Sequence, residues 1–182
     1  MKKIIEKFYY SYKEMKNVRS LVALSLLVAL QLVLSFFRID ILPTLRLSFA
    51  FIAIFLMGTM YGPVAAGLGA GMGDIIGYIM KPNGPYFFGF TFNAILGGVI
   101  VGLFMYRSKL SLWRVIGART CITVFVNLVL NTWWLSIIGG KAFMVLLMPR
   151  IAKNLTMLPI EIIIVWCLLK ALDGKLKTNN IL

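Results

Sequence analysis

Residues 64–80 read VAAGLGAGMGDIIGYIM and contain one charged side chain, Asp74. A helix needs about 20 predominantly apolar residues to cross the hydrocarbon core of a bilayer, so this stretch has the composition and nearly the full length of a membrane span. Its many alanines and glycines carry little or no side chain, which lets a neighbouring helix approach closely. The stretch therefore predicts a tightly packed helix inside a membrane bundle.

Similar apolar stretches fill most of the rest of the chain. Hydrophobic residues make up 60% of the 182 residues and charged residues only 14%, which lies outside the usual range for a soluble domain. Polar breaks and a Tyr61-Gly62-Pro63 turn separate five more expected spans, at about Leu21–Phe37, Ser48–Met60, Phe87–Tyr106, Val115–Ile138 and Ile151–Leu172. We expect an all-α integral membrane protein with six transmembrane helices in one bundle.

The two ends of the chain are more polar than the middle. Residues 1–18 carry apolar side chains at helical spacing among lysines, which predicts a short amphipathic helix on the membrane surface, with a frayed basic tail as the alternative. Residues 19–174 form the expected transmembrane domain, and residues 175–182 a polar tail. Within the domain, Phe143–Leu147 is expected to be a separate short re-entrant or interfacial piece.

The lysines and arginines beside the spans set the expected orientation. With the N-terminus inside, thirteen of the 19 basic residues fall on the inner side and six on the outer side, so both termini are expected to be cytoplasmic. The net charge of +13 is spread between the spans and forms no single basic face. That distribution argues against a nucleic-acid binder.

Polar side chains of four spans fall at a similar depth near the expected outer face. An uncompensated polar group in hydrocarbon is costly, so such groups face a cavity or one another. Two interpretations stay open, a binding pocket open to the outside and a hydrogen-bond network between helices; for the tryptophans an interfacial aromatic belt is a third. The acid Asp74 is expected to need a partner such as Arg150 or Lys153. The candidate residues are Asp74, Asn93, Asn127, Asn131, Trp133, Trp134, Arg150, Lys153 and Asn154.

The sequence contains little that indicates a catalytic site. Histidine is absent, and Cys121 and Cys167 lie in separate apolar surroundings. The deep acids Asp74 and Glu161 are placed on different spans and at different depths, and Glu161 is expected to pair with another helix. No nucleophile–base pair or metal cluster is visible, so we expect no enzyme, no metal and no cofactor. The glycines of residues 67–77 are not followed by Gly-Lys-Ser/Thr, which excludes a phosphate-binding loop.

Several motifs together carry a family resemblance. The segment GLGAGMGDIIG at 67–77, followed by Gly89-Phe90-Thr91 and Gly97-Gly98, resembles the substrate-binding S components of energy-coupling-factor (ECF) vitamin transporters. The segments NLVLNTWWL at 127–135 and PRIAKNLTMLPIE at 149–161 are similar to the folate-type members. The resemblance covers nearly the whole chain.

The resemblance implies a six-helix protein of the bacterial cytoplasmic membrane that binds one vitamin, here folate or a reduced folate, near its outer face. It also implies association with a transmembrane coupling subunit and two cytoplasmic ATPases, docked through small residues on the first span. The nearest matches to that docking face are Ala23, Ser25 and Ala29. An S component for another vitamin, a membrane-embedded enzyme and a structural membrane protein remain as alternatives.

Folate chemistry suits the candidate residues. Amides and acids match the donors and acceptors on the edge of the pterin ring, indole stacks on its face, and cations match the two carboxylates of the glutamate tail. We expect Asp74 to bind the amino and ring NH groups of the pterin. The candidates for the tail are Arg46, Lys141, Arg150 and Lys153, and those for a gate are the loops Phe36–Arg46 and Met80–Pro85.

Overall fold

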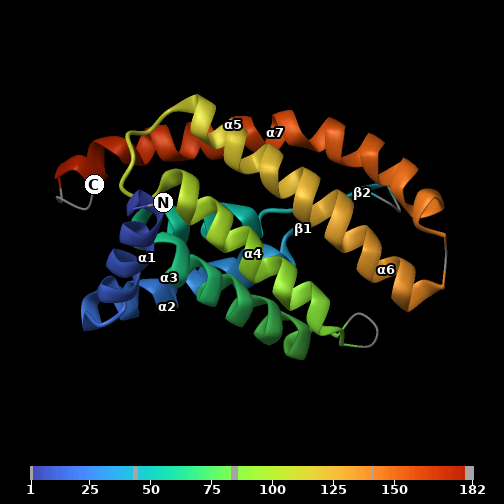
Figure 1. Cartoon of the computed structure of the whole chain (residues 1–182), viewed down its shortest axis with the longest axis horizontal. Helices are drawn as coiled ribbons and strands as arrows, with labels where there is room; N and C mark the ends of the chain where they lie inside the picture. Colours follow the sequence, from blue (N-terminus) through green and yellow to red (C-terminus); the bar gives the residue numbers. More distant parts are fainter. Residues whose placement is uncertain (1, 43–44, 83–85, 141, 179–182) are drawn as a thin grey trace.

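The computed structural model describes residues 2–42, 45–82, 86–140 and 142–178 (Figure 1). Within these ranges, five helical segments are long and apolar enough to cross a membrane, which confirms the expected helical membrane fold. The elements in chain order are α1 (Lys2–Glu14), α2 (Val18–Phe36), β1 (Arg38–Leu42), β2 (Leu45–Ser48), α3 (Ala50–Met80), α4 (Phe88–Met105), α5 (Leu112–Cys121), η1 (Ile122–Leu130), α6 (Asn131–Gly139) and α7 (Phe143–Thr178).

Helix α3 is a pair of helices that fold back on each other. Gly62 has φ 84° and ψ −172°, a conformation outside the helical region, and Pro63 follows it without a backbone donor. The Met57 sulfur lies 2.6 Å from the position that a Cβ on Gly69 would take. Twelve residues of straight helix would separate these two by about 18 Å. The turn expected at Tyr61-Gly62-Pro63 is therefore confirmed, and the two halves of α3 run antiparallel.

The second half of α3 packs on α4 through small residues. A Cβ on Gly98 would collide with the backbone of Ala66, and one on Gly102 with the backbone of Pro63. Side chains larger than hydrogen would push these helices apart, since backbone cannot move aside as a flexible side chain can. The glycines that the sequence places in both spans thus set the distance between the two helices.

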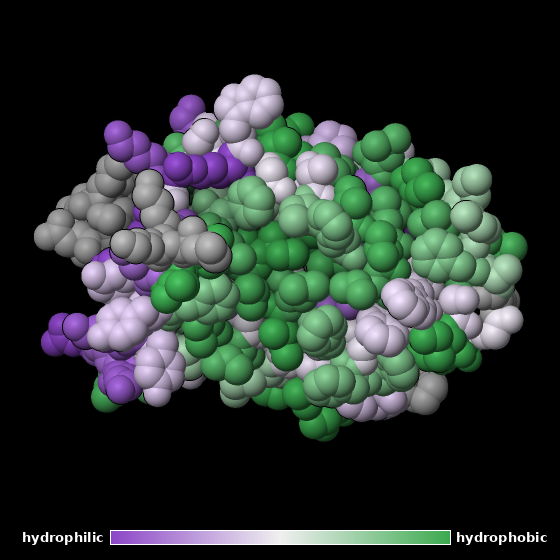
Figure 2. Space-filling model, in the orientation of Figure 1, coloured by the Kyte–Doolittle hydropathy of each residue, from purple (hydrophilic) through white to green (hydrophobic). Residues whose placement is uncertain are grey.

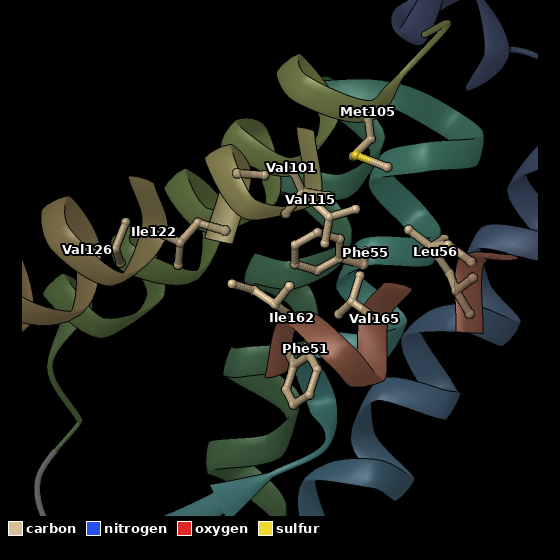
Figure 3. Close-up of a cluster of buried hydrophobic side chains, with 12 residues drawn as sticks. Phe51, Phe55, Leu56, Val101, Met105, Val115, Ile122, Val126, Ile162 and Val165 are labelled. Atoms are coloured by element: carbon tan, nitrogen blue, oxygen red, sulfur yellow. The ribbon is translucent and has the colours of Figure 1, made fainter. Parts of the chain in front are cut away.

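The main apolar core packs α3 and α4 against α7 and against α5 and η1, two helical segments that follow each other directly in the chain. Phe55 of the first half of α3 lies beside Val115 of α5 and Val165 of α7, and Phe51 lies below Ile162 of α7 (Figure 3). Val101 and Met105 of α4 complete this cluster, and both are buried. Because the cluster is contributed by four separate helical segments, it holds the helices around the cavity that is described below.

Helix α1 packs one of its faces against the bundle. The buried Ser11 hydroxyl donates to the Tyr61 carbonyl at 2.6 Å and accepts from the backbone N–H groups of Val64 at 3.1 Å and Ala65 at 3.3 Å. These two N–H groups lie in the first turn of the second half of α3 and have no partner within their own helix. Ser11 therefore acts as an N-cap supplied by another helix. The Lys7 ammonium donates to the Leu103 carbonyl at 2.8 Å, and burial lowers its pKa.

The opposite face of α1 exposes apolar side chains, among them Ile5, Tyr9 and Tyr12. The expected amphipathic helix is thus present, and its polar contacts tie it to the protein. Helix α1 and the end of α7 lie at the same end of the molecule (Figure 1). Hydrophilic residues gather at this end, while the middle of the molecule presents a mainly hydrophobic surface (Figure 2).

Two segments differ from their sequence-based expectation. The polar break after α2 contains an antiparallel hairpin, in which β1 pairs with β2 and Asp40 lies opposite Arg46. This hairpin is the departure from the all-α class within the described residues. The expectation of a separate short piece at Phe143–Leu147 was wrong, because these residues are the first turns of the continuous helix α7.

Candidate functional site

A cavity of about 650 Å³ lies between α3, α4, the η1–α6 segment and α7. Pockets for small organic ligands usually measure 300–1,000 Å³, so this one has room for a vitamin-sized molecule. Its described polar lining consists of amides, charged groups and one hydroxyl, and its walls are otherwise mainly apolar. The polar side chains in the lining are Ser48, Asn93, Arg119, Asn127, Asn131, Arg150, Lys153, Asn154 and Glu161.

Five of the predicted ligand-binding residues line this cavity together. Asn93 comes from α4, Asn127 from η1, Asn131 from α6, and Arg150 and Lys153 from α7. Since α4, the consecutive segments η1 and α6, and α7 are separate stretches of the chain, the fold brings these residues together. The depth argument from the sequence placed these groups together, and the structure brings them to one cavity.

A hydrogen-bond chain orders the α7 side of the cavity. An Nη1 N–H of Arg150 donates to the Asn127 carbonyl at 3.4 Å, which links α7 to η1. The Asn154 amide donates to the Arg150 carbonyl at 2.9 Å, one helical turn away. The Arg150 contact is long for a hydrogen bond, so it holds the guanidinium only weakly. The cation therefore remains available to an anion in the cavity.

The π-helical segment η1 explains how Asn127 and Asn131 come to share a face with two apolar residues. Hydrogen bonds from residue i to i+5 make each turn wider than in an α-helix. Residues four, five and nine positions apart then fall on one side, and Ile122, Val126, Asn127 and Asn131 all line the cavity. The sequence gives no sign of this wide turn, because its composition is that of an ordinary apolar helix.

The two tryptophans have different surroundings. The Trp134 indole N–H donates to the Asn93 side-chain oxygen at 3.2 Å, and its ring packs on Phe87 with centroids 5.4 Å apart. A Cβ on Gly89 would approach this indole to 2.8 Å, so glycine leaves room for it. Trp133 is 56% exposed and stacks on Trp134 from outside. Trp134 thus positions Asn93, whereas the exposure of Trp133 suits the aromatic-belt interpretation.

Asp74 lies in a second, smaller cavity of about 330 Å³. Its carboxylate accepts a hydrogen bond from the buried Thr91 hydroxyl at 2.7 Å, and the Thr91 oxygen is also 2.7 Å from the hydroxyl of Tyr86. The expected partnership of Asp74 with Arg150 is corrected, since Arg150 lines the larger cavity and contacts Asn127. The two cavities adjoin, because both are lined by Ser48, Ala50, Ile54 and Ala94.

An ion pair in the lining of the larger cavity includes a residue that the sequence analysis did not single out. The Arg119 guanidinium donates through Nε to the Glu161 carboxylate at 2.7 Å, and its Nη2 also contacts the same oxygen. The guanidinium also lies 4.7 Å from the centre of the Phe51 ring. Glu161 was expected to pair with another helix, which is confirmed. Arg119 was not singled out from the sequence, and it is buried inside α5.

Other predicted residues lie outside the cavity or beyond what the structure describes. Ala23, Ser25 and Ala29 are on α2, where Ser25 and Ala29 face outward and Ala23 is half-buried. The backbone of Arg46 belongs to β2, but its side chain is outside the described set, and Lys141 lies outside the described residues. Of the two expected gates, the first coincides with the hairpin, and part of the second (83–85) lies outside the described ranges.

Comparison with known proteins gives the family. The model of the ECF transporter, substrate-specific component, matches residues 19–169. A folate transporter FolT of Clostridium novyi (strain NT) is 39% identical over 159 residues, which cover 87% of this chain and 92% of the relative. Another FolT, from Leuconostoc mesenteroides subsp. mesenteroides, is 35% identical over 84% of this chain and 85% of its own length.

A solved structure agrees with these relatives. The crystal structure of FolT bound with folic acid superposes with a TM-score of 0.77 at 35% sequence identity, and the match covers 84% of this chain and 93% of that one. The resemblance carried by the glycine motif and by the two later segments is thereby confirmed. This chain belongs to the family of substrate-specific components of ECF transporters.

Proposed function

We propose that this chain is the folate-binding subunit of an ECF-type transporter, which captures folate or a reduced folate from outside the cell. The observation that carries the proposal is the charge of the larger cavity. Its described lining contains the cations Arg119, Arg150 and Lys153 and one acid, Glu161, so the lining carries a net charge of +2. Folate carries two carboxylates, and the charges of ligand and cavity are therefore complementary. The folate-transporter names of the relatives support the same ligand.

The lining also offers partners for each part of folate. Arg150 and Lys153 are our candidates for the glutamate tail, because charged donors make the stronger hydrogen bonds to carboxylates. Asn93, Asn127 and Asn131 each carry both a donor and an acceptor, which suits the mixed edge of the pterin. Asp74 has a supporting role in this proposal, since it lines the adjoining cavity and accepts a hydrogen bond from Thr91.

The proposed topology has six membrane crossings with both ends in the cytoplasm. The fold-back of α3 at Gly62 supports six crossings, because the five apolar segments then divide into six. An even number is also supported by the position of α1 and the end of α7 at the same end of the molecule (Figure 1). The excess of lysine and arginine at that end supports its cytoplasmic location. The cavity then faces the outside of the bacterial cytoplasmic membrane.

Release of the vitamin inside the cell is proposed to need a transmembrane coupling subunit and two cytoplasmic ATPases. The chain has no phosphate-binding loop of its own in its sequence. The proposed docking face is the outward side of α2, where Ser25 and Ala29 are one helical turn apart and exposed. Small residues at this spacing allow close contact with another helix, whereas Ala23 is half-buried and packs against the bundle.

Uptake of radiolabelled folate tests the proposal. Cells that produce the chain together with a coupling module should accumulate folate against a gradient. Cells that produce the chain alone should only bind it, at about one folate per chain. Thiamine and riboflavin in excess should not compete. If neither kind of cell retains folate above the level of cells without the chain, the proposed function is wrong.

A further inference from the structure

The acid that lines the larger cavity is Glu161, whereas Asp74 lines the smaller one. Asp74 accepts a short hydrogen bond from Thr91, which in turn pairs with Tyr86, so its carboxylate already belongs to a local network. Glu161 is 15% exposed in the absence of a ligand and can be reached from the cavity. The carboxylate best placed to meet a bound ligand is thus a different one from the acid that the sequence favoured.

Glu161 and the tail candidate Arg150 lie at opposite ends of the cavity. They are eleven residues apart on α7, which corresponds to about 16 Å along the helix. A pteridine, an aminobenzoyl ring and a glutamate joined end to end form a molecule of comparable length. A folate whose carboxylates bind near Arg150 therefore brings its pteridine to the neighbourhood of Glu161.

Arg119, the partner of Glu161 in this structure, shows which kind of hydrogen-bond donor the Glu161 carboxylate accepts. The Arg119 guanidinium offers two N–H groups from neighbouring nitrogens, and both contact the same oxygen, Oε2. The pteridine of folate presents a similar edge, in which the 2-amino group stands next to a ring N–H. A planar pair of donors is the arrangement that a carboxylate binds most strongly. The second oxygen, Oε1, is the acceptor that we assign to the ligand.

We propose that Glu161, positioned by Arg119, recognises the pteridine by accepting hydrogen bonds from its 2-amino and ring N–H groups. This assignment rests on the proposed folate-binding function. Arg119 does not contact the ligand in this account; its ion pair orients Glu161 and gives it a partner inside the membrane, where an unpaired acid would be costly. The Phe51 ring lies against the guanidinium and helps to fix it.

Three ligands separate recognition of the pteridine from a merely structural role of the ion pair. They are folate, pteroate, which lacks the glutamate, and N-(4-aminobenzoyl)-glutamate, which lacks the pteridine. The main variant is Arg119→Gln/Glu161→Gln, in which two neutral amides replace the ions and no buried charge is left alone. The comparison variant is Asp74→Asn, which neutralises the acid of the other cavity and tests that acid as the rival partner of the pteridine. Affinities are measured on the purified full chain in detergent.

The double variant should bind folate and pteroate about 10- to 100-fold more weakly, the usual cost of losing charge-assisted hydrogen bonds. Its affinity for N-(4-aminobenzoyl)-glutamate should stay within about twofold of the wild type, and Asp74→Asn should leave the ratio of these affinities unchanged. Because the readout is a ratio, loss of folded protein cancels. Glu161→Asp, which keeps the charge but withdraws the carboxylate, should move the ratio in the same direction.

Equal weakening of all three ligands in the double variant and in Glu161→Asp would overturn the assignment, as would the absence of any weakening. A change of the ratio in Asp74→Asn alone would assign the pteridine to the smaller cavity instead. A wild-type chain that binds none of the three ligands would overturn the proposed function itself, and this outcome is visible before any variant is made.

Discussion

Replacing Arg150 with alanine should weaken the binding of folate far more than that of pteroate. Arg150 lines the larger cavity on α7, and its side chain donates a 3.4 Å hydrogen bond to the Asn127 carbonyl. The truncation therefore breaks little that holds the protein together. What it removes is a cation that we place against the glutamate tail, and pteroate has no such tail.

The size of the effect follows from the kind of contact. A hydrogen bond to a charged group contributes about 1.5–3 kcal/mol, which corresponds to roughly 10- to 150-fold in affinity for folate. The neutral contact to Asn127 is long, so its loss should cost less than about 1 kcal/mol and should affect both ligands alike. Arg150→Lys should fall between wild type and alanine, because lysine keeps the charge and loses the planar fork.

Tryptophan fluorescence or calorimetry on the purified variants measures both dissociation constants. Trp134 contacts Asn93 at the edge of the same cavity, so its emission should report binding. Asn154→Ala on the same helix serves as the control, since it removes a contact to the Arg150 backbone without a change in charge. Equal losses for folate and pteroate in Arg150→Ala would refute the reasoning and show that Arg150 acts through the structure.

Three further outcomes follow from the packing. Gly102→Ala should lower the melting temperature clearly, because its Cβ would collide with the backbone of Pro63, whereas Gly139→Ala, which meets open space, should not; equal effects would contradict the packing argument. Ser11→Ala should cost about 1–2 kcal/mol of stability through the lost cap of α3, and an unchanged denaturation midpoint would exclude that role. Shortening the β1–β2 hairpin should change the on- and off-rates of folate in stopped-flow traces, and unchanged rates would remove the hairpin as a gate.

Patterns that repeat along the chain made much of the fold predictable. Apolar stretches of membrane-spanning length define the helices, and the Gly62-Pro63 pair marks the turn inside α3. The polar side chains of four spans could be placed at one depth by counting residues from the span ends. Asn93, Asn127 and Arg150 do line one cavity.

Features that depend on the direction of a single side chain were not predictable. Trp133 and Trp134 are neighbours, yet successive residues of a helix point about 100° apart, so only Trp134 reaches Asn93. Arg119 was not singled out, because it entered only the count of basic residues beside the spans, and its partner Glu161 is 42 residues away in sequence. The choice of Thr91 as the partner of Asp74 depends on the packing of α3 against α4, which composition does not reveal.

The central claim is that the larger cavity binds folate. The most direct test is a calorimetric titration of the purified wild-type chain with folate, and with thiamine and riboflavin as controls. The account predicts tight binding of about one folate per chain and no heat of binding for the two controls. Binding of either control in place of folate, or no binding of any of the three, would contradict it.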